Sequence, residues 1–201
     1  PERAHAYDRT ALEGISSGFS ELEAHCSTIV IQSTGDRAFC SGADLHEMTE
    51  ATPLDALDLF SQRVFNTIAR SPVVSVVAVQ GAAIAGGFEL ALACDIRIAG
   101  PKARFELPET ALGLVPSAGG STRLTRQVGP SLAKQVILAG RSLNADEAHQ
   151  YGLVLEIHED PRACALEWAR KIAARDPVAQ RLAKGIVDHT DDADSLQAER
   201  V

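Results

Sequence analysis

Two carboxylates and two glycine-bearing loops are the groups in this sequence that could do chemistry together. Glu89 lies in the loop of residues 81–90, which reads Gly-Ala-Ala-Ile-Ala-Gly-Gly-Phe-Glu-Leu, and Glu109 follows directly after Pro108. The other loop, residues 39–45, reads Phe-Cys-Ser-Gly-Ala-Asp-Leu. Small residues leave backbone N–H groups free to hold a developing oxyanion, and carboxyl groups can move protons. Together these groups predict acid–base chemistry on a substrate that develops negative charge on oxygen.

Each feature also has a purely structural interpretation when it is taken alone. The 39–45 loop can be a tight turn after a strand, with Asp44 bonding its own backbone. Gly86 would begin a helix whose unpaired N–H groups form an anion site, but the helix dipole also favours Glu89 there for structural reasons. A carboxylate after a proline, such as Glu109, is often a cap or a surface charge. The residues alone leave these alternatives open.

Common catalytic and metal-binding motifs are absent from the sequence. There is no G-x-S-x-G elbow, no phosphate loop ending in Gly-Lys-Ser/Thr, no G-x-G-x-x-G and no H-E-x-x-H. The acidic residues between 188 and 194 miss the spacing of a calcium loop and are interpreted as a solvated tail. We therefore expect no metal site. The cysteines form no C-x-x-C pair and predict small buried thiols in a reducing compartment: Cys26, Cys40, Cys94 and Cys164.

The composition is that of an ordinary globular chain. Its 201 residues are 45% hydrophobic and 23% charged, which excludes a disordered tail, a collagen-like fibre and a disulfide miniprotein. The net charge of −8 argues against the broad positive field of nucleic-acid-binding proteins. The sequence has neither a run of about 20 apolar residues that could span a bilayer nor a signal-peptide core at its start. We therefore expect a cytoplasmic protein that binds neither nucleic acid nor membrane.

Strands and one helix are predicted in the first half of the chain. The strands are runs of β-branched or small apolar residues at Ser27–Ser33, Pro72–Gln80 and Cys94–Ala99. The helix lies between the first two strands, with Thr52 as its cap and Pro53 at its first position. Its buried stripe would contain the apolar residues at helical spacing: Leu57, Phe60, Val64 and Ile68.

Helices dominate the second half. The segment Asn144–Glu147 has the pattern of a capping box, and Gly152 is a suitable end for the helix that it begins. Asp160-Pro161 and Asp176-Pro177 each begin a further helix in the same manner. Because strands and helices alternate to about residue 110 and helices follow, we predict an α/β fold with a mixed-sheet core and a helical region after it.

Three segments resemble the crotonase superfamily, also called the enoyl-CoA hydratase/isomerase family. Phe39–Leu45 resembles its F-C-x-G-A-D-L loop, and Ala82–Ile98 resembles its A-x-G-G-x-E-L-A-x-x-C-D-x-R-I stretch. Phe105–Leu124 resembles its F-x-x-P-E-x-x-x-G-x-x-P-x-x-G-G-x-x-R-L stretch. The similarity extends from about Arg3 to about Lys184. Long motifs in the same order with matching gaps are more specific than any single glycine loop.

The resemblance implies the fold and its division. A crotonase-type ββα spiral core would occupy residues 1–140, and a C-terminal helical region that helps to form trimers would occupy residues 141–201. The first residues resemble the segment just after the family's first strand, so we expect that strand to be missing and the helical region to be truncated at Val201. Two residues depart from the family pattern, and we expect them to tune loop geometry and acyl preference: Ser117 and Ala85.

The family's functional residues carry over to matching positions. By resemblance, the backbone N–H groups of Ala43 and Gly86 would form the oxyanion hole for a thioester carbonyl. Glu89 would activate the water that adds to C3, and Glu109 would protonate C2. Repulsion between two neighbouring carboxylates would keep one protonated and the other ionised. The resemblance also implies which residues contact the substrate or its coenzyme A: Arg37, Ala43, Asp44, Leu45, His46 and Gly86.

The reaction implied by the resemblance is reversible syn addition of water to a 2-enoyl-CoA, which gives a 3-hydroxyacyl-CoA. The chain would be a lyase of acyl-CoA metabolism that acts as a homotrimer or as a dimer of trimers. No cofactor is expected, because coenzyme A enters as part of the substrate. Many family members keep one or neither glutamate, so the presence of both favours hydration. The alternatives are a double-bond isomerase, a dehydratase, a thioester hydrolase, or a binding subunit without turnover.

Overall fold

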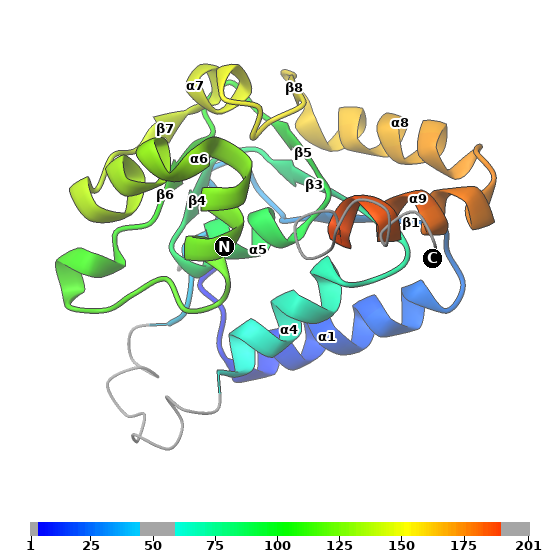
Figure 1. Ribbon diagram of the computed structural model, residues 1–201, viewed down its shortest axis with the longest axis horizontal. Coiled ribbons are helices and arrows are strands. Elements are labelled where there is room, and N and C mark those ends of the chain that lie inside the picture. The colour runs from blue at the N-terminus through cyan, green and yellow to red at the C-terminus, as the bar shows by residue number, and fades with distance from the viewer. Residues whose placement is uncertain (1–3, 45–58, 190–201) are drawn as a thin grey trace.

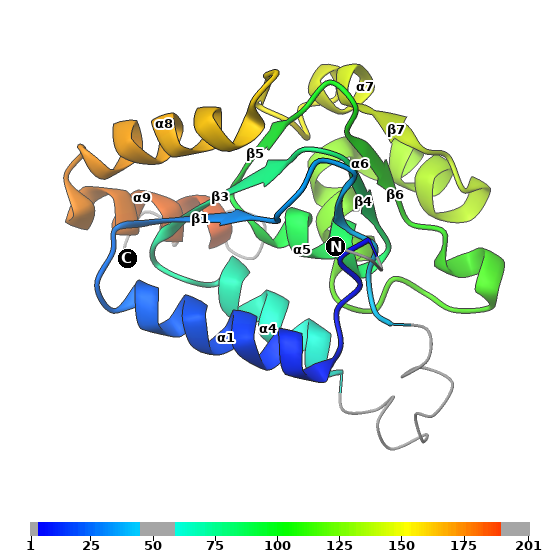
Figure 2. The ribbon, with the colours of Figure 1, turned by 180° about the vertical axis from the view of Figure 1, so that it is seen from behind.

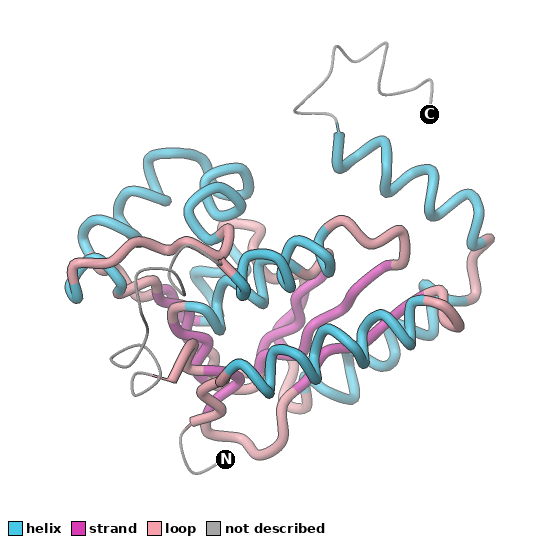
Figure 3. The backbone as a smooth tube through the Cα atoms, turned by 90° about the horizontal axis from the view of Figure 1, so that it is seen from below, coloured by secondary structure: helices cyan, strands magenta, loops and turns pink. Residues whose placement is uncertain are grey.

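The computed structural model describes residues 4–44 and 59–189. These residues form two four-stranded sheets that lie between helices (Figure 1, Figure 3). The first sheet is parallel throughout, in the order β1(Thr28–Gln32), β3(Val74–Val79), β5(Ile96–Ala99) and β8(Glu156–Ile157). The second sheet has the order β2(Ala38–Cys40), β4(Ala82–Ile84), β6(Arg104–Glu106) and β7(Leu143–Asn144), and only its last pair is antiparallel.

The chain alternates between the two sheets. The pairs β1–β2, β3–β4 and β5–β6 each place one strand in the first sheet and the next strand in the second. Each pair therefore forms one turn of a spiral that stacks on the preceding turn. This arrangement confirms the predicted crotonase-type α/β fold, and it brings the loops that follow β2 and β4 to one edge of the second sheet.

Helices cover the sheets on both sides. The helix α8(Pro161–Ala173) packs on β1, β3 and β5, whereas α1(Arg9–Glu23) and α4(Phe60–Ala69) lie side by side on the opposite side (Figure 1, Figure 2). The helix α5(Gly86–Ala93) lies inside and contacts β4, α4 and α6(Gly120–Ala139). Every residue of α5 is buried, so it is a core element rather than an amphipathic surface helix.

The three predicted strands are confirmed as β1, β3 and β5. Apolar β-branched residues fill them, and the Val74–Val79 strand is buried from its second residue onward. The predicted helix between the first two strands is confirmed from Phe60, with Val64 and Ile68 buried. The proposed start of that helix, with its cap and the apolar residue at 57, lies outside the described residues.

The predicted helices of the second half are confirmed as well. A capping box formed by Asn144 and Glu147 begins α7(Ala145–Gln150), and prolines begin α8 and α9(Pro177–His189). The short strands β7 and β8 add to both sheets after residue 110, so this part contributes to the sheets as well as to the helical layer. The division at residue 140 and the trimeric assembly remain predictions.

The described residues contain no helix long and apolar enough to cross a membrane. All the cysteine thiols are free, and three of them are buried, as the spacing predicted; Cys26 is partly exposed.

Candidate active site

The two glycine-bearing loops touch where β2 and β4 end. These strands pair in parallel, so the segments that leave them lie at the same edge of the sheet. Gly42 has φ 92°, and a Cβ on it would lie 3.0 Å from the backbone nitrogen of Gly86. The absence of a side chain at Gly42 therefore allows the two loops to come this close.

Two backbone N–H groups beside this contact are available to a ligand. Ala43 pairs with Tyr7 in a single parallel bridge, in which the Tyr7 N–H donates to Gly42 and the Asp44 N–H donates to Tyr7. These two bonds use the neighbours of Ala43 and leave its own N–H directed away from Tyr7. Gly86 is the first residue of α5, where an N–H has no partner within the helix. Within residues 4–44 and 59–189, neither N–H donates a hydrogen bond.

The chain turns sharply just before α5. Ala85 has φ 50° and ψ −126°, a conformation that costs an L-residue on the order of 1–3 kcal/mol. Its N–H donates to the carbonyl of Glu106, and its own carbonyl accepts from Phe88 and Glu89. Packing thus holds at Ala85 a backbone conformation that glycine would adopt more readily.

Glu89 is buried on α5 and is held by groups from another part of the chain. Its Oε1 atom accepts hydrogen bonds from the N–H groups of Ala118 and Gly120, each at 2.8 Å. A Cβ on Gly120 would lie 2.8 Å from Glu89 Cγ, so glycine permits this approach. Burial raises the pKa of Glu89, whereas the two N–H groups and the charge of Arg123 lower it.

Glu109 begins the short 3₁₀ helix η1(Glu109–Leu112) and is 9% exposed. Its Oε2 atom is buried and has no hydrogen-bond partner among the described residues. Burial raises the pKa of Glu109 to about 7, and the nearby charge of Glu89 contributes to the rise. The structure therefore brings the two carboxyl groups within electrostatic reach and gives them different hydrogen-bonding surroundings.

Tyr7 is a site residue that the sequence analysis did not identify. A Cβ on Gly86 would lie 2.0 Å from the Tyr7 hydroxyl, so this hydroxyl packs directly against the start of α5. Burial raises the pKa of the Tyr7 hydroxyl, and the charges of Glu89 and Glu109 raise it further. No sequence motif marks this tyrosine, because its importance arises from a contact across 79 positions of the chain.

The predicted coenzyme A contacts are only partly brought together. Ala43, Asp44 and Gly86 lie at the junction of the loops. Arg37 is exposed at the other end of β2, where its carbonyl lies against Gly81, so the structure separates it from the oxyanion donors. The two remaining predicted contacts lie outside the described residues: Leu45 and His46.

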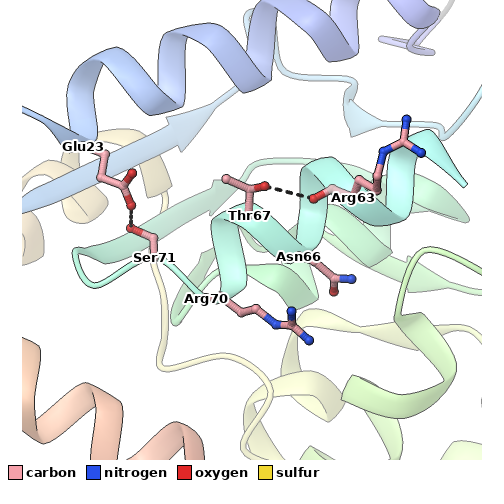
Figure 4. A pocket seen from close by; sticks show the side chains of 6 residues that line it. All are labelled: Glu23, Arg63, Asn66, Thr67, Arg70 and Ser71. Carbon is pink, nitrogen blue, oxygen red and sulfur yellow. Dashed lines mark hydrogen bonds between the residues drawn. The ribbon is translucent and has the colours of Figure 1, made fainter.

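The described part of the chain offers no group of three metal-ligating side chains. A cavity of about 430 Å³ lies beside α4, and neither Ala43 nor Gly86 lines it (Figure 4). Its lining is polar: Glu23, Arg63, Asn66, Thr67, Arg70 and Ser71.

The chain is similar to known proteins along its whole length. The model of the enoyl-CoA hydratase/isomerase family matches residues 1–201. The short-chain-enoyl-CoA hydratase of Clostridium acetobutylicum is 34% identical over 194 residues, which cover 94% of this chain and 74% of that protein. The crystal structure of an enoyl-CoA hydratase from Bacillus anthracis superimposes with a TM-score of 0.93 at 33% identity, covering 100% of this chain and 81% of the other.

A third relative differs in its named substrate and compartment. The mitochondrial methylglutaconyl-CoA hydratase of Mus musculus is 39% identical over 190 residues, which cover 90% of this chain and 60% of that protein. Similarity of this degree thus extends to proteins named for different acyl groups. The cytoplasmic location of this chain remains a prediction.

Proposed function

The chain belongs to the enoyl-CoA hydratase/isomerase family, and we propose that within this family it hydrates a 2-enoyl-CoA reversibly to a 3-hydroxyacyl-CoA. One observation carries this proposal: the structure holds two buried carboxyl groups with unlike surroundings, together with two backbone N–H groups that have no partner among the described residues. Hydration needs one group to take a proton from water and another to deliver a proton to carbon. A pair of carboxyl groups with different proton affinities meets both needs.

The N–H groups of Ala43 and Gly86 supply the electrostatic part of the reaction. The thioester carbonyl of the substrate would accept both hydrogen bonds. As water adds to C3, electron density moves onto this oxygen and forms an enolate, which the two donors stabilise. Donors that are already fixed in place cost little reorganisation, and one such donor is typically worth about 10²–10³ in turnover.

The two glutamates move the protons. Glu89 is the base: burial raises its pKa, but two N–H groups and Arg123 stabilise its ionised form, which accepts a proton from the water that attacks C3. Glu109 has a pKa of about 7, so much of it is protonated near neutral pH and it delivers its proton to C2. Each turnover adds the hydroxyl of one water to C3 and one proton to C2. A proton transfer from Glu89 to Glu109 through the product or solvent restores the starting state.

The substrate assignment rests on the family and on the loop geometry. Coenzyme A would approach along Ala43 and Asp44, with Arg37, Leu45 and His46 as further contacts. No separate cofactor is proposed, and the assembly is proposed to be a homotrimer or a dimer of trimers.

Crotonyl-CoA is a direct probe of this proposal. Loss of the conjugated-thioester absorbance, with a product heavier by one water in mass spectrometry, is the expected result. Glu109→Gln should lower turnover by about 10²–10⁴ while binding of the CoA ester persists. Glu167→Gln, an exposed glutamate on α8, is the matched control and should leave turnover unchanged. A product of unchanged mass with a shifted double bond, or a Glu109→Gln variant at wild-type rate, would overturn the assignment.

A further inference from the structure

Glu89 depends on a turn that is distant from it in the sequence. Both of its hydrogen bonds come from the turn of residues 118–120, at the start of α6. Within this turn Gly119 adopts φ 102°, which is available to glycine at little cost. The position and charge state of Glu89 therefore depend on whatever holds this turn.

The guanidinium of Arg123 holds the turn. Its Nη1 atom donates to the Ala118 carbonyl at 2.9 Å, and its Nη2 atom donates to Asn66 Oδ1 at 2.6 Å. A Cβ on Gly119 would lie only 2.1 Å from Nη1, so the turn folds directly over the guanidinium. The Ala118 carbonyl thus accepts a hydrogen bond from Arg123, and the N–H of the same residue donates to Glu89.

The second anchor of the guanidinium is a helix on the other side of the turn. Asn66 belongs to α4, and Figure 4 shows its side chain extending from the same side of this helix as Arg70. Arg123, which belongs to α6, therefore bonds to α4 through Asn66 and to the 118–120 turn through the Ala118 carbonyl. Because the fork of donors is planar and rigid, both bonds fix the orientation of the guanidinium.

We propose that Arg123 is a positioning residue for Glu89, fixing the 118–120 turn so that its two N–H groups hold the carboxyl group in place to accept the proton of water. The catalytic part of this inference rests on the proposed hydration. The hydrogen bonds from Arg123 to the turn and from the turn to Glu89 are present whichever reaction the protein catalyses. Its geometry needs a forked donor that reaches both Ala118 and Asn66, which a lysine cannot reproduce.

The charges around Glu89 are consistent with this role. Arg123 faces Glu89 from α6, the carboxyl group of Glu109 faces it from η1, and the Tyr7 hydroxyl faces it from the segment before α1. Of these groups Arg123 carries the positive charge, and it lowers the pKa of Glu89. Replacing Arg123 would remove that charge and release the turn. Both changes favour the protonated form of Glu89, which cannot act as a base.

The test compares Arg123→Gln with Arg126→Gln, an exposed arginine on the same helix. We expect Arg123→Gln to lower kcat with crotonyl-CoA about tenfold or more, with little change in KM. The acid limb of the pH profile of kcat/KM should move upward by about one pH unit or more. Arg126→Gln should leave kcat and KM within about twofold of wild type and should not move the acid limb. Arg123→Lys keeps the charge but loses the fork, so it should recover part of the pH shift and little of kcat.

A second readout does not depend on turnover. The Glu89 carboxyl can be titrated by ¹³C NMR, its signal being assigned by its loss in Glu89→Gln, and Arg123→Gln should raise its midpoint. If wild-type protein fails to hydrate crotonyl-CoA, the proposed function is contradicted, while the titration still decides the role of Arg123. Should Arg123→Gln fail to fold, Asn66→Ala releases one anchor and should raise the midpoint by a smaller amount. A folded variant with an unchanged Glu89 midpoint would overturn the proposal.

Discussion

Replacement of Gly86 by alanine should damage the proposed oxyanion hole through a single methyl group. The new Cβ would lie 2.0 Å from the hydroxyl oxygen of Tyr7 and 2.8 Å from its Cζ. Ordinary contact begins at 3.4 Å, so the loop or the ring must move by about 1.4 Å. Tyr7 is 6% exposed, its ring packs edge-on against Phe65, and its backbone is bonded to Gly42 and Asp44. Part of the movement therefore displaces the Gly86 N–H.

A displacement of this size is large for a catalytic donor. A misplacement of about 1 Å costs on the order of 10² in rate, and complete loss of one oxyanion donor costs about 10²–10³. We therefore expect kcat for Gly86→Ala to fall about 10²-fold. Overpacking at a buried position should also lower the free energy of unfolding by about 1–3 kcal/mol.

Crotonyl-CoA turnover measures the first effect, and chemical denaturation measures the second. Gly14→Ala on α1 is the matched control, because nothing lies within 4 Å of a Cβ there. That control should keep wild-type turnover and gain about 0.5–1 kcal/mol of stability. Adding Tyr7→Phe to Gly86→Ala removes the closest atom and should restore part of the lost rate. A Gly86→Ala enzyme with wild-type kcat would refute the reasoning from this contact.

Three further outcomes can be measured on single variants. Glu89→Gln keeps an oxygen acceptor for the Ala118 and Gly120 N–H groups, so turnover should fall about 10²–10⁴ with stability retained; Glu89→Ala should also lose about 1–3 kcal/mol of unfolding free energy. Burial raises the pKa of Glu109 from 4.5 to about 7, so its contribution to the free energy of unfolding is complete below pH 4.5 and is lost as the pH rises through 7. In Glu109→Gln, the denaturation midpoint should no longer show this decrease with rising pH. Asn144→Ala removes the cap of α7 and should lower the unfolding free energy by about 1 kcal/mol, measured by denaturation.

Elements with strong local signals were predictable from the sequence. The valine-rich strand β3 and the capping box of α7 are specified by residues close in the chain. The strands β2, β4 and β6 have three residues each, so their existence depends on pairing partners that local patterns do not reveal. The helix α6 contains Gly129, whose φ of 76° and ψ of 163° are not helical, and Pro130 follows it, so α6 is two helical stretches joined at a kink.

One missed helix had a readable signal. Asp8 caps α1 by accepting from the Ala11 N–H, and Leu12, Ile15 and Phe19 follow at helical spacing. That pattern was available in the sequence and predicts an amphipathic helix.

The residues of the candidate site also differ in whether the sequence alone reveals them. Glu89 and Glu109 were identifiable because carboxylates beside glycine loops are chemically distinctive and match a family pattern. Tyr7 and Arg123 were not identified as site residues, because each acts through contacts that only folding creates. The Tyr7 hydroxyl meets Gly86, and Arg123 reaches across to α4. Sequence patterns thus indicated the groups proposed to react, and the structure added the contacts from which positioning roles are proposed.

The two glutamates are the same residue type, so their surroundings alone must make them differ. Burial raises the pKa of both, but Glu89 also receives two backbone N–H groups and the charge of Arg123. Glu109 has a buried Oε2 atom without a hydrogen-bond partner among the described residues, and the charge of Glu89 opposes its ionisation. If Glu109 were ionised in place of Glu89, its buried Oε2 atom would carry charge with no donor among the described residues to stabilise it. The N–H groups of Ala118 and Gly120 would then donate to a neutral Glu89. The positions of the backbone donors therefore support the proposed assignment of Glu89 as the base and Glu109 as the acid.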